Sequence, residues 1–239
     1  MLVEVCANSL ESALNAEKAG ADRIELCSEL AVGGITPSYG LLQSVKEKVS
    51  IPIHVLIRPR SGDFTYSDLE FDIMKRNIAL CVNLGFEGIV SGVLHKDFTL
   101  DVERTRELIE LSNGLNFTFH RAFDWVKDPK AVLAQLELLG VDCILSSGQG
   151  KSSVEGIKLL SELDERTMKC LIMPGGGIRA DNVHQFKKKG FSAIHLSGSK
   201  FIKTLDVAPK VSMNSPLFLK DDAISVTGVE LIKKIVNEV

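Results

Sequence analysis

One short layout recurs along this chain and limits the folds that it can adopt. In residues 20–26 a glycine is followed by two turn residues and then by an apolar run. The same layout returns in residues 85–90, 140–145 and 190–196. Glycine suits the end of a helix because that position often needs a left-handed backbone. Each copy therefore marks the start of a strand, and each interval between copies has room for two strand–helix units.

The apolar runs between these marks predict eight strands. Many are continuously apolar and β-branched, which is typical of parallel strands that helices cover. The predicted strands are residues 2–6, 22–27, 52–57, 87–91, 116–120, 142–146, 170–174 and 193–197. The predicted helices are residues 9–19, 38–48, 67–83, 101–112, 129–139, 152–163, 180–189 and 228–238. Residues 204–227 lack periodicity and contain two prolines, so we expect a long loop there, after the eighth strand.

Eight strand–helix units in 239 residues fit a closed barrel. The rival architecture is an open doubly wound sheet, which usually carries a glycine-rich loop after its first strand. Residues 6–9 read Cys-Ala-Asn-Ser and do not form such a loop. We therefore predict an α/β fold, a single (β/α)₈ TIM barrel that forms one domain over residues 1–239.

Composition and charge narrow the classes of partner. The chain is 45% hydrophobic and 25% charged, with a net charge of −3, so neither nucleic acid nor a membrane surface is an expected partner. No apolar run approaches the ~18 residues that span a bilayer, and no leader-like segment precedes residues 2–6. The five cysteines are scattered and odd in number, which predicts free thiols in a reducing cytosol. The oligomeric state stays open, a homo-oligomer included.

The carboxyl ends of barrel strands carry active sites, and here those ends hold unusual side chains. A packed barrel interior normally takes branched aliphatic residues. The polar and thiol residues at the predicted strand ends are Glu4, Cys6, Glu25, Cys27, His54, Arg58, Ser91, Thr118, His120, Ser146, His195 and Ser197.

Glu25, Arg58 and His120 form the sharpest group among them. A carboxylate inside a barrel is costly unless it is paired. Arginine offers a permanent bidentate partner, and histidine exchanges protons near neutral pH. The three residues are therefore candidates for an acid/base catalytic site. The structural alternative is a buried ion-pair network that only fills the barrel.

Two glycine turns, after the seventh and eighth strands, are a second signal. Glycines let backbone N–H groups approach an anion, and loops seven and eight of barrels often hold phosphate. The turn after the seventh strand leads toward the predicted helix 180–189, whose amino end favours negative charge. The alternative is that these turns simply require glycine. The predicted anion site consists of Gly175, Gly176, Gly177, Gly198, Ser199 and Arg60.

Cys6 and Cys27 end neighbouring strands, which lie ~4.8 Å apart. Two soft thiolates at that range could hold Cu(I). Inward residues of neighbouring strands belong to alternate layers, however, so the sulfurs could be staggered. The alternative role is that of small apolar fillers, which is common for free cysteine.

The chain resembles the CutC copper-homeostasis family over roughly residues 1–200. The matching segments are residues 4–6, 20–27, 33–38, 57–64, 66–68, 118–124, 146–148 and 173–178. The resemblance implies a TIM barrel, a cytosolic protein and a part in copper handling. It also implies that Cys6 and Cys27 are the Cu(I) ligands.

Two functions follow from these observations, and the alternative to both is an assembly scaffold with a vestigial site. The first is a cytosolic copper-homeostasis protein that binds Cu(I) through its thiols. The second is an enzyme (an isomerase, lyase or hydrolase) that acts on a small phosphorylated or carboxylated metabolite. In that enzyme Glu25 and His120 would exchange protons, Arg58 would hold a carboxylate or stabilise an oxyanion, and the glycine turns would bind phosphate. The expected partner is thus a copper ion or a small anionic metabolite, and no organic cofactor is implied.

Overall fold

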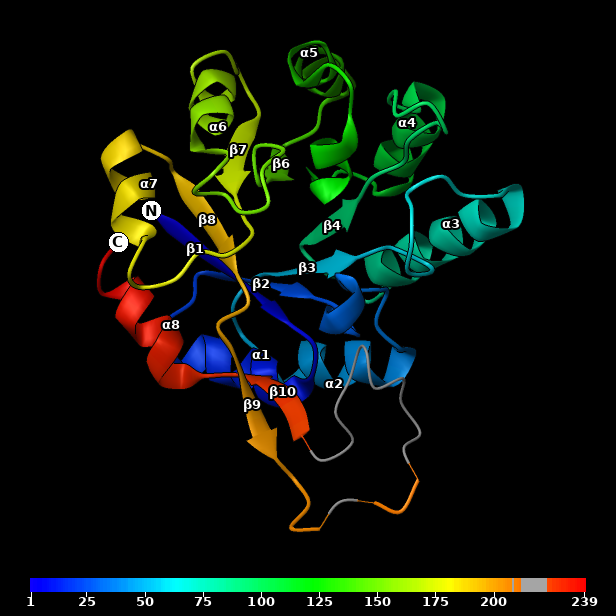
Figure 1. Cartoon of the computed structure of the whole chain (residues 1–239). Coiled ribbons are helices and arrows are strands. Elements are labelled where there is room, and N and C mark those ends of the chain that lie inside the picture. Colours follow the sequence, from blue (N-terminus) through cyan, green and yellow to red (C-terminus); the bar gives the residue numbers. More distant parts are fainter. Residues whose placement is uncertain (208, 212–222) are drawn as a thin grey trace.

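The computed structural model describes residues 1–207, 209–211 and 223–239. Within these ranges, parallel strands alternate with helices around a barrel (Figure 1). The barrel strands are β1 (Leu2–Ala7), β2 (Arg23–Leu26), β3 (Ile53–Leu56), β4 (Gly88–Ser91), β5 (Asn116–Phe119), β6 (Cys143–Ser146), β7 (Leu171–Pro174) and β8 (Ala193–Leu196). The covering α-helices are α1 (Leu10–Lys18), α2 (Tyr39–Lys48), α3 (Asp68–Asn83), α4 (Val102–Leu111), α5 (Pro129–Leu139), α6 (Ile157–Asp164), α7 (Val183–Lys189) and α8 (Val229–Val236). Two 3-10 helices, Leu30–Val32 and Arg121–Trp125, follow β2 and β5.

The strands form one ring in the order β7-β6-β5-β4-β3-β2-β1-β8. A parallel bridge between Gly175 and His195 joins β7 to β8 and completes it. The predicted (β/α)₈ TIM barrel is therefore confirmed. Among the described helices, none is both long and apolar enough to cross a membrane.

Alternation along each strand separates two sets of side chains. On β1, Val3 and Val5 join the large apolar cluster that the helices cover, whereas Glu4 and Cys6 belong to the other face, inside the barrel. The outer face is mainly apolar, and its burial against the helices stabilises the fold. The inner face is free to carry polar side chains, provided that they find partners.

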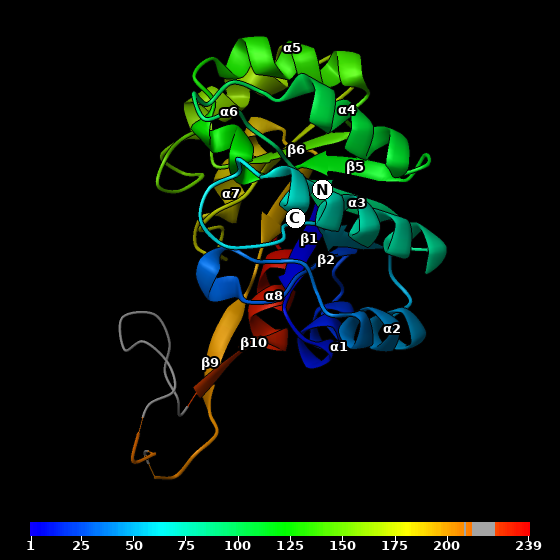
Figure 2. The same ribbon diagram turned by 90° about the vertical axis from the view of Figure 1, so that its right-hand side faces the viewer.

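The prediction of a loop over residues 204–227 is wrong at its end. Ser199–Lys203 and Ala223–Thr227 form an antiparallel hairpin of strands β9 and β10, which extends away from the barrel (Figures 1 and 2). Thr227 ties β10 to α1, because its N–H donates to Ser12 Oγ at 3.2 Å and its carbonyl accepts from Asn15 Nδ2 at 3.1 Å. The predicted loop residues 208 and 212–222 lie outside the described part of the chain.

Two helices begin later than the sequence predicts. Residues 152–156 form turns before α6, and Ser153 donates from its N–H and its hydroxyl to the carbonyl of Gly176. Helix α7 begins at Val183 rather than at residue 180. Before α6 the chain thus makes a contact between two loops, and before α7 Asn182 hydrogen-bonds within its own loop, to Gly177 and Arg179.

A steric prediction follows from the packing of the barrel interior. His54 is buried beside its register partner Gly88, where an added Cβ would lie only 2.4 Å from the imidazole ring. We expect G88A to lower the free energy of unfolding by about 1–3 kcal/mol, the usual cost of overpacking. Urea denaturation measures this loss. The control G40A adds the same methyl group where nothing lies within 4 Å, so equal stability of the two variants would contradict the packing described.

Candidate functional site

A buried carboxylate on β1 organises the interior of the barrel. Glu4 is fully buried, and one of its oxygens accepts from Arg23 Nε on β2. The other lies 2.8 Å from His195 Nδ1 on β8. Burial alone would raise the pKa of Glu4, but the hydrogen bond to His195 and the Arg23 charge outweigh burial and lower it to about 2. Because Glu4 is then ionised, it accepts the hydrogen bond, and His195 Nδ1 carries the proton.

Cys6 lies between an acid and a second thiol. Its Sγ donates to Glu25 Oε1 at 3.3 Å and lies 3.3 Å from Cys27 Sγ. The strand register explains this placement, because Cys6 pairs with Glu25, and Cys27 stands two residues after Glu25, just past the end of β2. The stagger between neighbouring strands thus does not separate the two sulfurs; Cys6 contacts both residues.

Burial and hydrogen bonding oppose ionisation of Cys6, and burial opposes ionisation of Glu25. The hydrogen bond to Cys27 and burial raise the pKa of the Cys6 thiol well above its ordinary value. Burial raises the pKa of Glu25, although the nearby His195 opposes the shift. The second oxygen of Glu25, Oε2, is buried and has no hydrogen-bond partner.

Arg58 hydrogen-bonds to the backbone of two loops at the mouth of the barrel. Its guanidinium donates to the carbonyls of Val32 and Gly34 after β2 and to that of Gly62 after β3, at 2.8–2.9 Å. It also lies over the ring of Phe64, 5.1 Å from the centroid. These contacts hold two loops together and occupy both terminal nitrogens of Arg58, the residue expected to hold a carboxylate or stabilise an oxyanion.

His120 follows β5 and contacts the same aromatic ring. Its centroid is 4.8 Å from that of Phe64, and its Nδ1 accepts from the N–H of Ala122 at 3.2 Å. Burial, together with the Arg58 charge, lowers the pKa of His120 to about 3. The ring is therefore neutral near pH 7, and its buried Nε2 has no partner.

One cavity of about 1300 Å³ opens at the carboxyl ends of the strands and brings most of the predicted residues together. The predicted residues that line it are Cys6, Glu25, Arg58, His120, Gly176, Gly177, Gly198 and Ser199. No hydrogen bond joins any two of Glu25, Arg58 and His120 among the described contacts, so their shared catalytic role stays a prediction.

The predicted anion site is only partly assembled. Gly176 and Gly177 have φ values of +103° and +83°, in the left-handed region that favours glycine. They do not lead directly into α7, however, because residues 178–182 intervene and Asn182 Nδ2 donates to the Gly177 carbonyl. The helix dipole expected there is therefore absent from the site. Arg60 is turned away and pairs with the carboxylates of Glu70 and Asp63.

Other residues of the barrel interior and of its mouth were missed as members of the site. Glu4 and His195 lie in predicted strands, where they alternate with buried apolar residues. That alternation was the signal in the sequence that both side chains point into the barrel. Arg121 and Asp124 follow β5 and form an ion pair at 2.7 Å. Asp124 also accepts from the N–H of Ser147 after β6 at 2.9 Å, so this pair links the mouth loops after β5 and β6.

Fold and site together define a (β/α)₈ barrel protein whose mouth places two buried thiols beside ionisable side chains. The model of the CutC family matches residues 1–200. The chain belongs to the CutC family.

Individual relatives agree with this assignment. The chain is 44% identical to a CutC family protein of Enterobacter sp. (strain 638), over 93% of this chain and 88% of that protein. It is 43% identical to the copper homeostasis protein cutC homolog of Homo sapiens, over 97% of this chain and 86% of the human protein. The crystal structure of the putative copper homeostasis protein CutC from Streptococcus agalactiae superposes with a TM-score of 0.77 at 37% identity, over 82% of this chain and 97% of that one.

Acid should destabilise the protein partly through His120. Its pKa is about 3 in the folded chain and ~6.5 in an unfolded chain. Between these values the unfolded chain binds a proton that the folded chain does not, so stability is full above pH 6.5 and falls as the pH decreases. From pH 7 to pH 5 the contribution of His120 to the free energy of unfolding should fall by about 2 kcal/mol.

The variant H120N removes this titration and keeps an oxygen that can accept from the N–H of Ala122. Urea denaturation at pH 7 and pH 5 should show a smaller acid-induced loss for H120N than for the wild type. His184 is exposed on α7, and H184N should behave like the wild type. An unchanged acid response in H120N would show that His120 is not the buried neutral histidine described above.

Proposed function

We propose that this protein binds Cu(I) in the cytosol through Cys6 and Cys27. The observation that carries the proposal is the 3.3 Å separation of the two sulfurs. Metal–thiolate bonds of ~2.3 Å, as found for zinc, let two sulfurs on one ion lie up to ~4.6 Å apart. Both sulfurs are therefore within reach of a single ion.

The donor chemistry also suits Cu(I). Thiolates are soft ligands, which Cu(I) prefers over carboxylate or water. Leu56 and Val90 pack with the two cysteines in an apolar cluster, so part of the surroundings of the sulfurs is apolar. All five cysteines are free thiols, which agrees with a reducing compartment.

The names of relatives support the same direction. The human protein is called a copper homeostasis protein cutC homolog, and the streptococcal structure is described as a putative copper homeostasis protein. The cargo would be the ion itself, held at the closed end of the cavity until a partner with stronger ligands removes it.

Serine at both cysteines should abolish Cu(I) binding and leave the fold intact, because serine is close in size and a much poorer ligand for a soft ion. Anaerobic titration of C6S/C27S against a chromophoric Cu(I) chelator measures the affinity. The matched control is C170S, at a buried cysteine near β7 that should not affect binding. An affinity of C6S/C27S equal to that of the wild type would return both cysteines to the role of core fillers.

A second candidate function is catalysis on a small anionic metabolite. The specific observation is that the cavity is lined by Arg58, Arg121, Arg179 and Lys234 as well as by the acid/base groups Glu25 and His120. Arg58 already donates to loop carbonyls and Arg121 already pairs with Asp124. Arg179 and Lys234 are therefore the cations left to attract an anion, and neither is a ligand for Cu(I). In this function the cations would bind the substrate while Glu25 and His120 move its protons.

Phosphate or a simple sugar phosphate should then raise the thermal unfolding temperature at low salt. The effect should weaken at higher salt, because charges are screened over ~8–10 Å. G176D places a carboxylate beside Arg121, 3.4 Å from the position of the new Cβ, and should abolish the stabilisation. The control G114D adds the same charge at another left-handed glycine with open space around it. A wild type that gains no stability from any of these anions would remove the enzyme as a candidate.

A further inference from the structure

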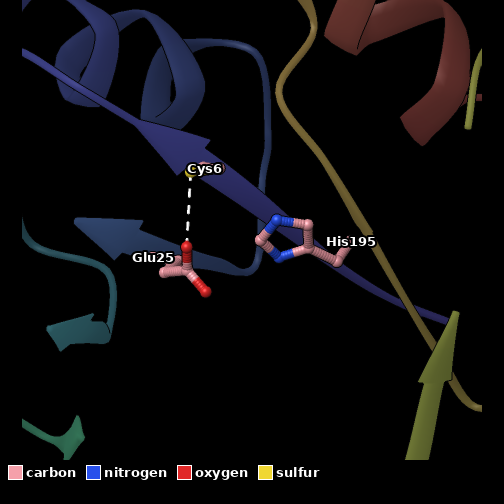
Figure 3. A group of neighbouring side chains, drawn as sticks. All are labelled: Cys6, Glu25 and His195. Carbon is pink, nitrogen blue, oxygen red and sulfur yellow. Dashed lines mark hydrogen bonds between the residues drawn. The ribbon is translucent and has the colours of Figure 1, made fainter. Parts of the chain in front are cut away.

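Three different donor atoms converge at the closed end of the cavity. Cys6 on β1, Glu25 on β2 and His195 on β8 each offer one ligand atom, and these atoms all lie within 4.8 Å of one another. Figure 3 shows the three side chains pointing toward a common space. Within the described residues, no other group of three or more such side chains meets this criterion.

An unpaired oxygen points to a ligand at this place. Glu25 is 96% buried, with 4% of its surface exposed, and its Oε2 has no hydrogen-bond partner. A buried carboxyl oxygen without a partner costs free energy, because it has lost its hydrogen bonds to water. A bound cation would supply the missing partner.

The histidine is oriented as a metal-ligating histidine is. His195 donates from Nδ1 to Glu4 at 2.8 Å, and Glu4 is itself held by Arg23. Such a carboxylate–histidine contact fixes the ring and its tautomer and leaves Nε2 as the ligand atom. This Glu4–His195 pair takes no part in the proposed Cu(I) site.

We propose that Cys6, Glu25 and His195 bind a zinc(II) ion whose fourth coordination position is open to the cavity. A thiolate, a carboxylate and an imidazole are the three ligand types of zinc sites, and catalytic zinc sites combine three protein ligands with one open position. Bonds of ~2.0–2.3 Å in a tetrahedral site place the ligand atoms ~3.3–3.8 Å apart. Shifts of about 1 Å would therefore bring the three side chains onto one ion. All three residues line the cavity, which gives the open position access to small molecules.

The zinc site goes beyond the proposed Cu(I) function and shares Cys6 with it. Cys27 Sγ lies 3.3 Å from Cys6 Sγ, but Cys27 is not one of the three ligands. Cu(I) would use the two sulfurs, and zinc would use one sulfur with an oxygen and a nitrogen. The two ions should therefore exclude each other, and single substitutions should separate their sites.

The test measures Zn²⁺ and Cu(I) affinities of the same variants by anaerobic competition with chromophoric chelators. E25Q is nearly isosteric, and H195N keeps an N–H that can donate to Glu4 but lacks the second ring nitrogen. We expect each to lower the Zn²⁺ affinity by more than ~100-fold, above the range for loss of an outer-shell contact, with little change for Cu(I). C27S should show the reverse pattern. The exposed H184N is the control for both ions.

Cobalt(II) provides an independent measurement. The wild-type protein loaded with Co²⁺ should show a thiolate-to-cobalt charge-transfer band, which C6S should lack and C27S should keep. Thermal unfolding verifies that each variant folds. If H195N does not fold, the Zn²⁺ affinity of E25Q alone tests the proposed zinc site. The proposal is overturned if the wild type binds no Zn²⁺, if E25Q binds it as tightly as the wild type, or if C27S loses it. The Cu(I) result for C27S tests the proposed function separately.

Discussion

The charge of Glu4 is the constraint on which the inside of this barrel depends. A fully buried carboxylate is tolerated only when cations and hydrogen bonds compensate for the lost water. Here Arg23 and His195 supply that compensation from the two strands that flank β1. The hydrogen bond from His195 to Glu4 fixes the orientation of the imidazole ring, and thereby determines which ring atom faces Glu25 and Cys6. Removing the carboxylate would leave the buried His195 and the half-buried Arg23 without their acidic partner, so the chain keeps a polar interior that aliphatic residues could otherwise fill.

Most of the fold could be predicted from the sequence, because a run of apolar residues marks a buried strand or helix face without knowledge of distant contacts. The strand from residue 116 and the helix to residue 83 were placed within a residue of their observed bounds. The later start of α6 could not be foreseen, since Ser153 hydrogen-bonds to Gly176, a residue distant in the chain. Strand β10 was missed although Val226 and Thr227 are buried, because its partners on α1 lie more than 200 residues away.

The candidate site was harder to predict, because its residues gain their roles from partners on other strands. Glu25 and Cys6 stand at recognisable strand ends, and their convergence follows from barrel geometry. His195 was not selected, since nothing near it in the sequence reveals the Glu4 contact. Arg58 was assigned to a substrate because its carbonyl partners cannot be read from residue types. A sequence motif shows which side chains are charged, but it does not show which backbone carbonyls will lie near them in the fold.

The unequal exposure of the two cysteines has a kinetic consequence. Cys6 lines the cavity, whereas Cys27 has no exposed surface. For any ion held by both sulfurs, an incoming thiol can attack only from the side of Cys6. Exchange would therefore be ordered: the Cys6 bond breaks first, and the Cys27 bond is released last. This order of bond breaking favours direct transfer of the ion to a second protein, through an intermediate in which both proteins hold it. It also slows loss of the ion to solvent, so the ion can stay bound for long even where the affinity of the site is modest.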